Sequence, residues 1–165
     1  MVKAIVLYNS HTGNTKKVAE KIAEGLGVES RDKKNIPDLQ DFDLVALGSW
    51  VIMGRISFGG ARYLRRIRKK LAGKKVALFF TSAGPDEDHW KKEDGSKPRK
   101  IKDVMFKQME RIVNKHGNVS ILSERFYCKG YIKFGGQEDN IGHPTDEDLE
   151  KAKEFGGQLR QILET

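Results

Sequence analysis

Short strand-like runs that alternate with stretches of helical periodicity restrict the fold of this 165-residue chain more than any other feature. The runs that suit buried strands are residues 2–8, 44–48, 76–80 and 119–122, and the polar stretch 28–32 suits an edge strand. Strands that alternate with helices form parallel sheets with helices on both faces. The sequence therefore predicts a single α/β domain over residues 1–165, built on a five-stranded parallel sheet.

The helices are expected where apolar residues recur every three or four positions. Such stripes occupy residues 18–26, 61–71 and 101–113, and a last one follows Thr145. Gly25 and Gly27 are interpreted as stop signals for the first helix, and Thr145 with Asp148 as the capping box of the last. After the final predicted strand, residues 126–128 could continue it.

The charge of the chain, +8, restricts its partners. One basic cluster comprises Arg62, Arg65, Arg66, Arg68, Lys69, Lys70, Lys74 and Lys75, and a second comprises Lys91, Lys92, Lys97, Arg99, Lys100 and Lys102. Such a field attracts acidic partners and also holds nucleic acid or anionic membranes without specificity. The alternative is a solvated, charge-rich surface of a kind suited to high temperature.

Other function classes are excluded by composition. No apolar stretch approaches the ~20 residues of a transmembrane helix, and no secretory signal is recognisable, so a cytoplasmic location is expected. Cys128 is the only cysteine, which excludes an intrachain disulfide; beside an apolar run, its thiol is expected to be buried and inert. The four histidines are scattered, and no metal site is expected.

A turn rich in hydroxyl groups lies between the first predicted strand and the first predicted helix. Its residues are Ser10, His11, Thr12, Gly13, Asn14 and Thr15. The first N–H groups of a helix have no partner within the helix, and its dipole places roughly half a positive charge there, so this turn suits a phosphate. An ordinary helix cap is the alternative.

The spacing Ser-x-Thr-Gly-x-Thr in this position resembles the phosphate loop of the flavodoxin family, whose ligand is flavin mononucleotide (FMN). The resemblance implies a flavodoxin-like three-layer sandwich with strand order 2-1-3-4-5, and a cofactor beyond the carboxyl ends of the strands. Residues 10–15 would hold the phosphate. His11 would either contact the phosphate when protonated or be exposed.

Two more loops are expected at the same edge of the sheet. The loop after the third predicted strand contains Ser49, Trp50, Val51, Ile52, Met53 and Gly54, and the loop after the fourth contains Ser82, Ala83, Gly84 and Trp90. By the resemblance, Met53 and Gly54 would face N5 of the flavin, with Trp50 as an apolar wall and Trp90 stacked on the ring. The alternatives are a plain strand-to-helix connection with a buried tryptophan, and a Trp90 exposed on a mobile loop.

Three functions remain open at this stage. Residues 49–55 and 126–130 look like the branch that contains short archaeal flavodoxins and menaquinone-dependent protoporphyrinogen oxidases, so the first expectation is an FMN-binding electron carrier. Its basic face would dock an acidic redox protein of the ferredoxin or reductase type, with no specific nucleic acid. The second is an FMN-dependent oxidoreductase acting on a quinone or protoporphyrinogen, with residues 86–100 shaping the substrate site. The third is a basic binding module without flavin.

Overall fold

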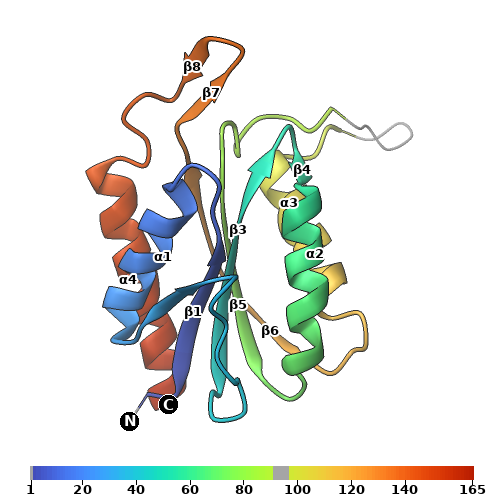
Figure 1. The fold of residues 1–165 in the computed structure, drawn as a ribbon, viewed down its shortest axis with the longest axis vertical. Coiled ribbons are helices and arrows are strands. Elements are labelled where there is room, and N and C mark those ends of the chain that lie inside the picture. Colours follow the sequence, from blue (N-terminus) through green and yellow to red (C-terminus); the bar gives the residue numbers. More distant parts are fainter. Residues whose placement is uncertain (1, 91–96) are drawn as a thin grey trace.

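The computed structural model, which describes residues 2–90 and 97–165, shows a parallel sheet between two layers of helices (Figure 1). Lys91 and Lys92 of the second basic cluster lie outside the described residues. The elements in chain order are β1 (Ala4–Asn9), α1 (Asn14–Leu26), β2 (Ser30–Asp32), β3 (Leu44–Ile52), β4 (Arg55–Ile56), α2 (Phe58–Ile67), the 3-10 helix η1 (Arg68–Lys70), β5 (Lys75–Ser82), α3 (Ile101–Val113), β6 (Ser120–Lys129), β7 (Ile132–Phe134), β8 (Gln137–Asp139) and α4 (Asp146–Glu164).

The main sheet confirms the predicted topology. Its strands follow the order β2-β1-β3-β5-β6, and every neighbouring pair along this path is parallel. Because β5 and β6 are the fourth and fifth parallel strands, this is the order 2-1-3-4-5. The short strand β4 pairs antiparallel with the end of β3, outside this path.

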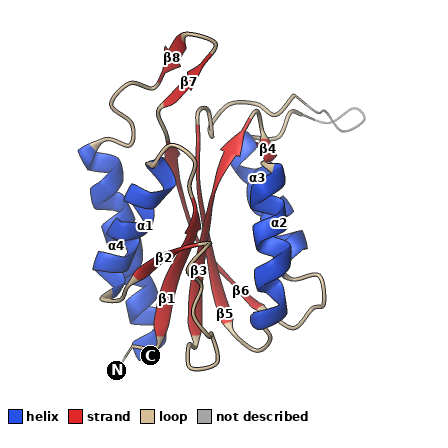
Figure 2. Ribbon diagram, viewed as in Figure 1, coloured by secondary structure: helices blue, strands red, loops and turns tan. Residues whose placement is uncertain are grey.

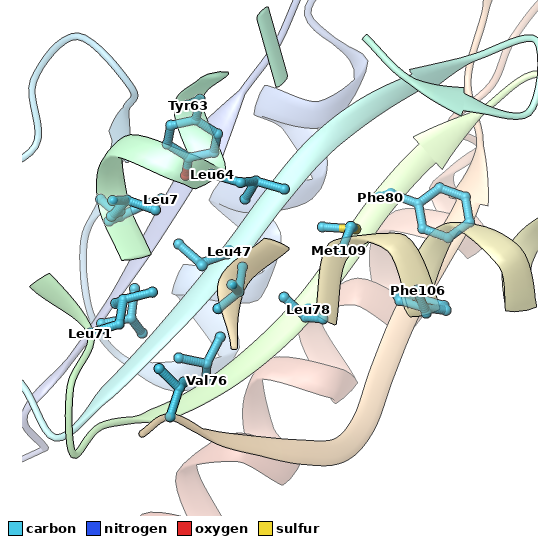
Figure 3. Close-up of a cluster of buried hydrophobic side chains, with 14 of the residues drawn as sticks. Leu7, Leu47, Tyr63, Leu64, Leu71, Val76, Leu78, Phe80, Phe106 and Met109 are labelled. Atoms are coloured by element: carbon cyan, nitrogen blue, oxygen red, sulfur yellow. The ribbon is translucent and has the colours of Figure 1, made fainter. Parts of the chain in front are cut away.

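The two helical layers bury different residues of the same strands. Helices α1 and α4 cover one face, and α2 and α3 cover the other (Figure 2). Alternate residues of a strand point to opposite faces, so Leu7 and Leu47 pack toward α2 and α3, whereas Val6 and Ala46 pack toward α1 and α4. Figure 3 shows the first of these clusters.

Two of the parallel strands are longer than their apolar runs predict. β3 continues through Ile52 and β5 through Ser82, because polar and aromatic residues at their ends still pair across the sheet, Ser49 with Phe80 and Trp50 with Thr81. The last strand includes residues 126–128, with an irregular register where β6 passes β5, as the sequence left open. The small β7–β8 hairpin was not predicted, since its short polar strands have no apolar periodicity.

The interpretation of Gly25 as a stop signal is wrong. Only Gly27 ends α1, with a left-handed φ of 76°, while Gly25 lies inside the helix. A Cβ at Gly25 would come within 1.9 Å of the Lys153 carbonyl oxygen of α4, and one at Gly156 within 2.1 Å of the Ile22 carbonyl oxygen. These two glycines therefore allow the backbones of α1 and α4 to touch.

The start of the last helix confirms the predicted capping box. Thr145 Oγ1 accepts from the N–H of Asp148 at 3.1 Å, and the Asp148 carboxylate accepts from the N–H of Thr145 at 2.9 Å. Within the described part of the chain, no helix is long and apolar enough to span a membrane.

Candidate cofactor-binding site

The turn at residues 10–15, called the phosphate loop below, holds backbone donors ready for an anion. Ser10 Oγ accepts from the N–H of Gly13 at 3.1 Å and from that of Lys16 at 3.3 Å, which closes the turn. Gly13 has a φ of 95°, and a Cβ there would meet no atom within 4 Å. Among residues 2–90 and 97–165, nothing accepts a hydrogen bond from the N–H of Thr12 or Asn14. Free donors beside open space are what a phosphate requires.

Two side chains of this loop make internal contacts instead. Thr15 is fully buried, and its hydroxyl pairs with that of Thr81 in β5 at 2.8 Å. Asn14 Nδ2 donates to the carbonyl of Tyr131 at 2.7 Å and to Thr12 Oγ1 at 3.1 Å. These side chains tie the phosphate loop to β5 and to the chain after β6, and their direct contact with a phosphate stays a prediction.

The segment predicted as a loop after the third strand is in fact the end of β3 and a tight hairpin turn. Ile52 pairs with Arg55, and the two residues between them, Met53 and Gly54, have φ values of 51° and 66°. Positive φ at both central positions is typical of a type I′ turn. This conformation is unusual for methionine, and it leaves the Met53 side chain 74% exposed.

Side chains near the end of β3 divide between the core and the cleft. Ser49 is fully buried and accepts from Asn9 Nδ2 at 3.4 Å, so it faces the interior. Trp50 is half-buried, and its ring stacks on exposed His11 with 5.1 Å between centroids. Trp50 therefore links the end of β3 to the phosphate loop.

The loop after β5 is anchored to the β3–β4 turn. His89 is buried, and its Nε2 lies 3.1 Å from the Gly54 carbonyl, so Nε2 donates in this pair. A Cβ at Gly54 would approach His89 Cδ2 to 3.1 Å. Trp90 is 61% exposed; its ring stacks on His89 at 5.2 Å and carries the Arg55 guanidinium 5.2 Å from its centroid.

Two adjoining hollows lie between these loops. The inner cavity, of about 260 Å³, is lined by His11, Thr12, Asn14, Trp50, Val51, Ile52, Thr81, Ser82, Ala83, Gly130, Tyr131, Ile132, Lys133 and Phe134. The outer hollow, of about 400 Å³, is lined by Ile52, Met53, Gly54, Ser82, Ala83, Gly84, Glu87, Asp88, Trp90, Ile101, Ile132, Phe134, Gln137 and Asp139. Because the two share five lining residues, they form one cleft that runs from the phosphate loop to the loop after β5.

The structure brings together most of the predicted site residues. Twelve of the sixteen line the cleft. Thr15 and Ser49 are buried instead, and Ser10 and Gly13 belong to the closed turn of the phosphate loop. Trp90 lines only the outer hollow, whereas Phe134 lines both.

The segment after β6 forms a wall of the cleft that sequence reasoning missed. Residues 130–134 line the inner cavity, and the β7–β8 hairpin stands over it (Figure 1). Asn140 Nδ2 donates to the carbonyl of Ala83 at 2.6 Å and to that of Gly130 at 3.2 Å, which fixes the base of the hairpin. The one feature of the sequence that could have indicated this wall is its position, because the segment follows a parallel strand and so begins at the same carboxyl edge of the sheet.

The acidic residues of the loop after β5 separate into two sets. Glu87 and Asp88 line the outer hollow. Asp86 instead accepts from Tyr127 Oη at 2.9 Å beside Lys102, and these contacts lower the pKa of its carboxyl group. Asp86 therefore lines neither hollow of the cleft.

Cys128 has the buried environment that the sequence predicts. Cys128 is buried, and burial raises the pKa of its thiol to about 12, so the thiolate is scarce at neutral pH. The residues that the structure describes contain no cluster of three or more metal-ligating side chains.

The fold and the phosphate loop together define a flavodoxin-like protein with a cleft at the carboxyl edge of its sheet. The chain belongs to the flavodoxin domain family, which matches residues 5–156.

Relatives of similar length span nearly the whole chain. An uncharacterized protein from Methanocaldococcus jannaschii is 31% identical over 96% of this chain and 98% of its own length. The flavodoxin-like domain-containing protein BilS from Clostridioides difficile is 32% identical over 96% of each chain. A solved flavodoxin from the domain Archaea superimposes with a TM-score of 0.66 over 99% of this chain and all of its own, at 20% identity, which shows the shared fold.

Proposed function

We propose that this protein binds FMN in the cleft and carries electrons between protein partners. The observation that supports this most strongly is the phosphate loop: Thr12 and Asn14, whose N–H groups have no acceptor among the described residues, line the inner cavity, which adjoins the outer hollow. Together the hollows fall within the roughly 300–1,000 Å³ typical of small-molecule sites. Membership of the flavodoxin domain family supports FMN as the ligand and the cytoplasm as the location.

The phosphate end of the cofactor would be held without a lysine. The N–H groups of Thr12 and Asn14 would donate to it at the start of α1, and the Thr12 hydroxyl lines the same cavity. Ser10 Oγ is committed to closing the turn, so its role is to hold these donors in place.

The ring end would lie between apolar walls. Trp50 and Ile52 supply one side, while Ile132 and Phe134 of the hairpin segment supply another. These side chains exclude water, and the backbone groups of Ser82 and Ala83 at the end of β5 can meet a polar ring edge. When bound, FMN supplies reversible transfer of one or two electrons, and the protein sets its orientation and potential.

A visible absorption spectrum of the purified protein, before and after adding FMN, tests the proposal directly. We expect a flavin spectrum and quenched flavin fluorescence at one FMN per chain, with weaker binding of riboflavin because it lacks the phosphate. A colourless protein that cannot be reconstituted would contradict the proposal and favour the basic binding module without flavin.

The outer hollow favours an FMN-dependent oxidoreductase as the second candidate. A space of about 400 Å³ beside the inner cavity leaves room for a substrate. Glu87, Asp88 and Asp139 on its wall would disfavour the carboxylates of a protoporphyrinogen, so a neutral quinone is the better fit. Steady-state turnover of quinones by the FMN-loaded protein would support this candidate over the carrier.

A further inference from the structure

We propose that helix α2 and the β3–β4 turn form the docking surface for an acidic electron-transfer protein, beside the mouth of the cleft. The inference rests on the proposed carrier function and specifies which surface the partner meets and what charge it carries. The proposed surface contains cations of the first of the two basic clusters.

The segment that builds this surface has no acidic residue. Residues 44–85 contain neither aspartate nor glutamate. Their cations are Arg55, Arg62, Arg65, Arg66, Arg68, Lys69, Lys70, Lys74 and Lys75. Since no carboxylate of the segment can neutralise them, their positive field extends into solvent.

Helix α2 presents part of this charge as an outward row. Tyr63, Leu64 and Ile67 point into the core, so Arg62 and Arg66, one turn apart, lie on the exposed face. In the described ranges, neither arginine forms an ion pair, and Arg66 donates only to a backbone carbonyl, that of Lys33, at 3.1 Å.

The second basic cluster is partly neutralised by contrast. Lys100 pairs with Asp88 at 2.8 Å, and Lys102 pairs with Asp86 at 3.3 Å. In the first cluster, Lys69, Lys70 and Lys74 share a hollow with Asp38, and the Asp32 carboxylate accepts from the backbone N–H of Lys34. The unneutralised charge is therefore concentrated on α2.

Exposed apolar side chains stand beside the arginine row. Met53 is 74% exposed, Phe58 81% and Trp90 61%, and Arg55 lies over the Trp90 ring. Aromatic residues, methionine and arginine are enriched in protein interfaces, whereas binding to a phosphate backbone needs cations alone. This mixture favours a protein over a nucleic acid.

The surface is next to the mouth of the cleft. Met53 and Trp90 line the outer hollow, and β4 leads directly into α2, as Figure 1 shows. Glu87 and Asp139 lie on other parts of the hollow. A partner with acidic groups around an apolar contact would be attracted to the arginines of α2 and repelled by these carboxylates, which restricts how it sits over the mouth.

The test compares two charge reversals of equal size and spacing. One variant is R62E/R66E on α2, and its control is K107E/R111E on the exposed face of α3, four residues apart in each case. The probe is an acidic plant-type ferredoxin, with affinity for the purified protein measured by calorimetry at about 50 mM and about 200 mM salt. Circular dichroism verifies folding, and FMN affinity is measured separately by flavin fluorescence.

We expect R62E/R66E to weaken ferredoxin binding by about tenfold or more at low salt, and the control by less than about threefold. F58A should weaken binding while leaving its salt dependence unchanged, because it removes only apolar contact. Equal losses in both charge variants, no effect of F58A, or tighter binding to duplex DNA that R62E/R66E abolishes would each overturn the proposal. A failure to bind FMN would defeat the carrier function alone, since ferredoxin binding is read without flavin.

Discussion

The phosphate loop and the segment 130–139 line the same cleft, but they differ in how they are specified. The conformation of the loop is determined by residues that are close in sequence, because Ser10 and Gly13 close a turn that leads directly into α1. The other segment is held by distant residues: Asn14 donates to the carbonyl of Tyr131, and the carbonyl of Ser82 accepts from the N–H of Gly130. One wall of the cleft is therefore determined by a short sequence motif, whereas the wall formed by residues 130–139 depends on contacts between residues far apart in sequence.

A negative charge in the phosphate loop should produce the largest effect. We expect Thr12→Glu to weaken FMN binding by about 100-fold, roughly 2.7 kcal/mol, because a carboxylate would occupy the anion site. Riboflavin binding, measured by the same fluorescence titration, should change by less than about threefold. Equal losses for both flavins would contradict a phosphate-specific role of the loop.

Two adjacent glycines of α4 separate the effect of a long-range backbone contact from the effect of local helix propensity. Gly156→Ala should lower the free energy of unfolding by about 2 kcal/mol, because its Cβ would meet the backbone of α1. Gly157 has open space around its Cβ position, so Gly157→Ala should raise stability by roughly 0.5–1 kcal/mol through helix propensity alone. Urea denaturation of both variants measures this, and effects of the same sign would contradict the close contact.

The hairpin wall is tested by removing its aromatic side chain. We expect Phe134→Ala to weaken FMN and riboflavin equally, by about tenfold, since Phe134 lines both hollows and contacts no phosphate site. Trp90→Ala is the matched control, and it should cost less because Trp90 lines only the outer hollow. A larger loss at Trp90 would support the prediction that Trp90 stacks on the ring.

The link between the two regions should give the smallest effect. Asn14→Ala removes the hydrogen bond to the Tyr131 carbonyl, worth about 1 kcal/mol. We expect FMN and riboflavin affinities to fall together by about three- to fivefold. Hydrogen exchange should also rise in residues 130–139, and unchanged exchange there would show that the loop and the hairpin segment are independent.

The alternation of apolar runs and helical stripes predicted the parallel sheet, and Thr145 with Asp148 predicted the capping box of α4. The strand order was implied by the resemblance to the flavodoxin family. Prediction failed where tertiary contacts extend or override a local pattern. Residues 49–52 belong to β3 because they pair with β5, and Gly25 stays helical because α4 passes against it. Twelve predicted residues do line the cleft, whereas the contribution of residues 130–134 had no periodic or motif signal.

The sequence by itself determined the features that depend on neighbours in the chain: the apolar strands, the turn at Gly13, the caps and the excess of positive charge. Only the tertiary structure decided which cations remain unneutralised and which segments face each other across the cleft. The physical reason is that hydrogen bonds such as Asn14 to Tyr131, and ion pairs such as Lys102 to Asp86, join residues far apart in sequence. Their partners are chosen by the packing of the whole domain.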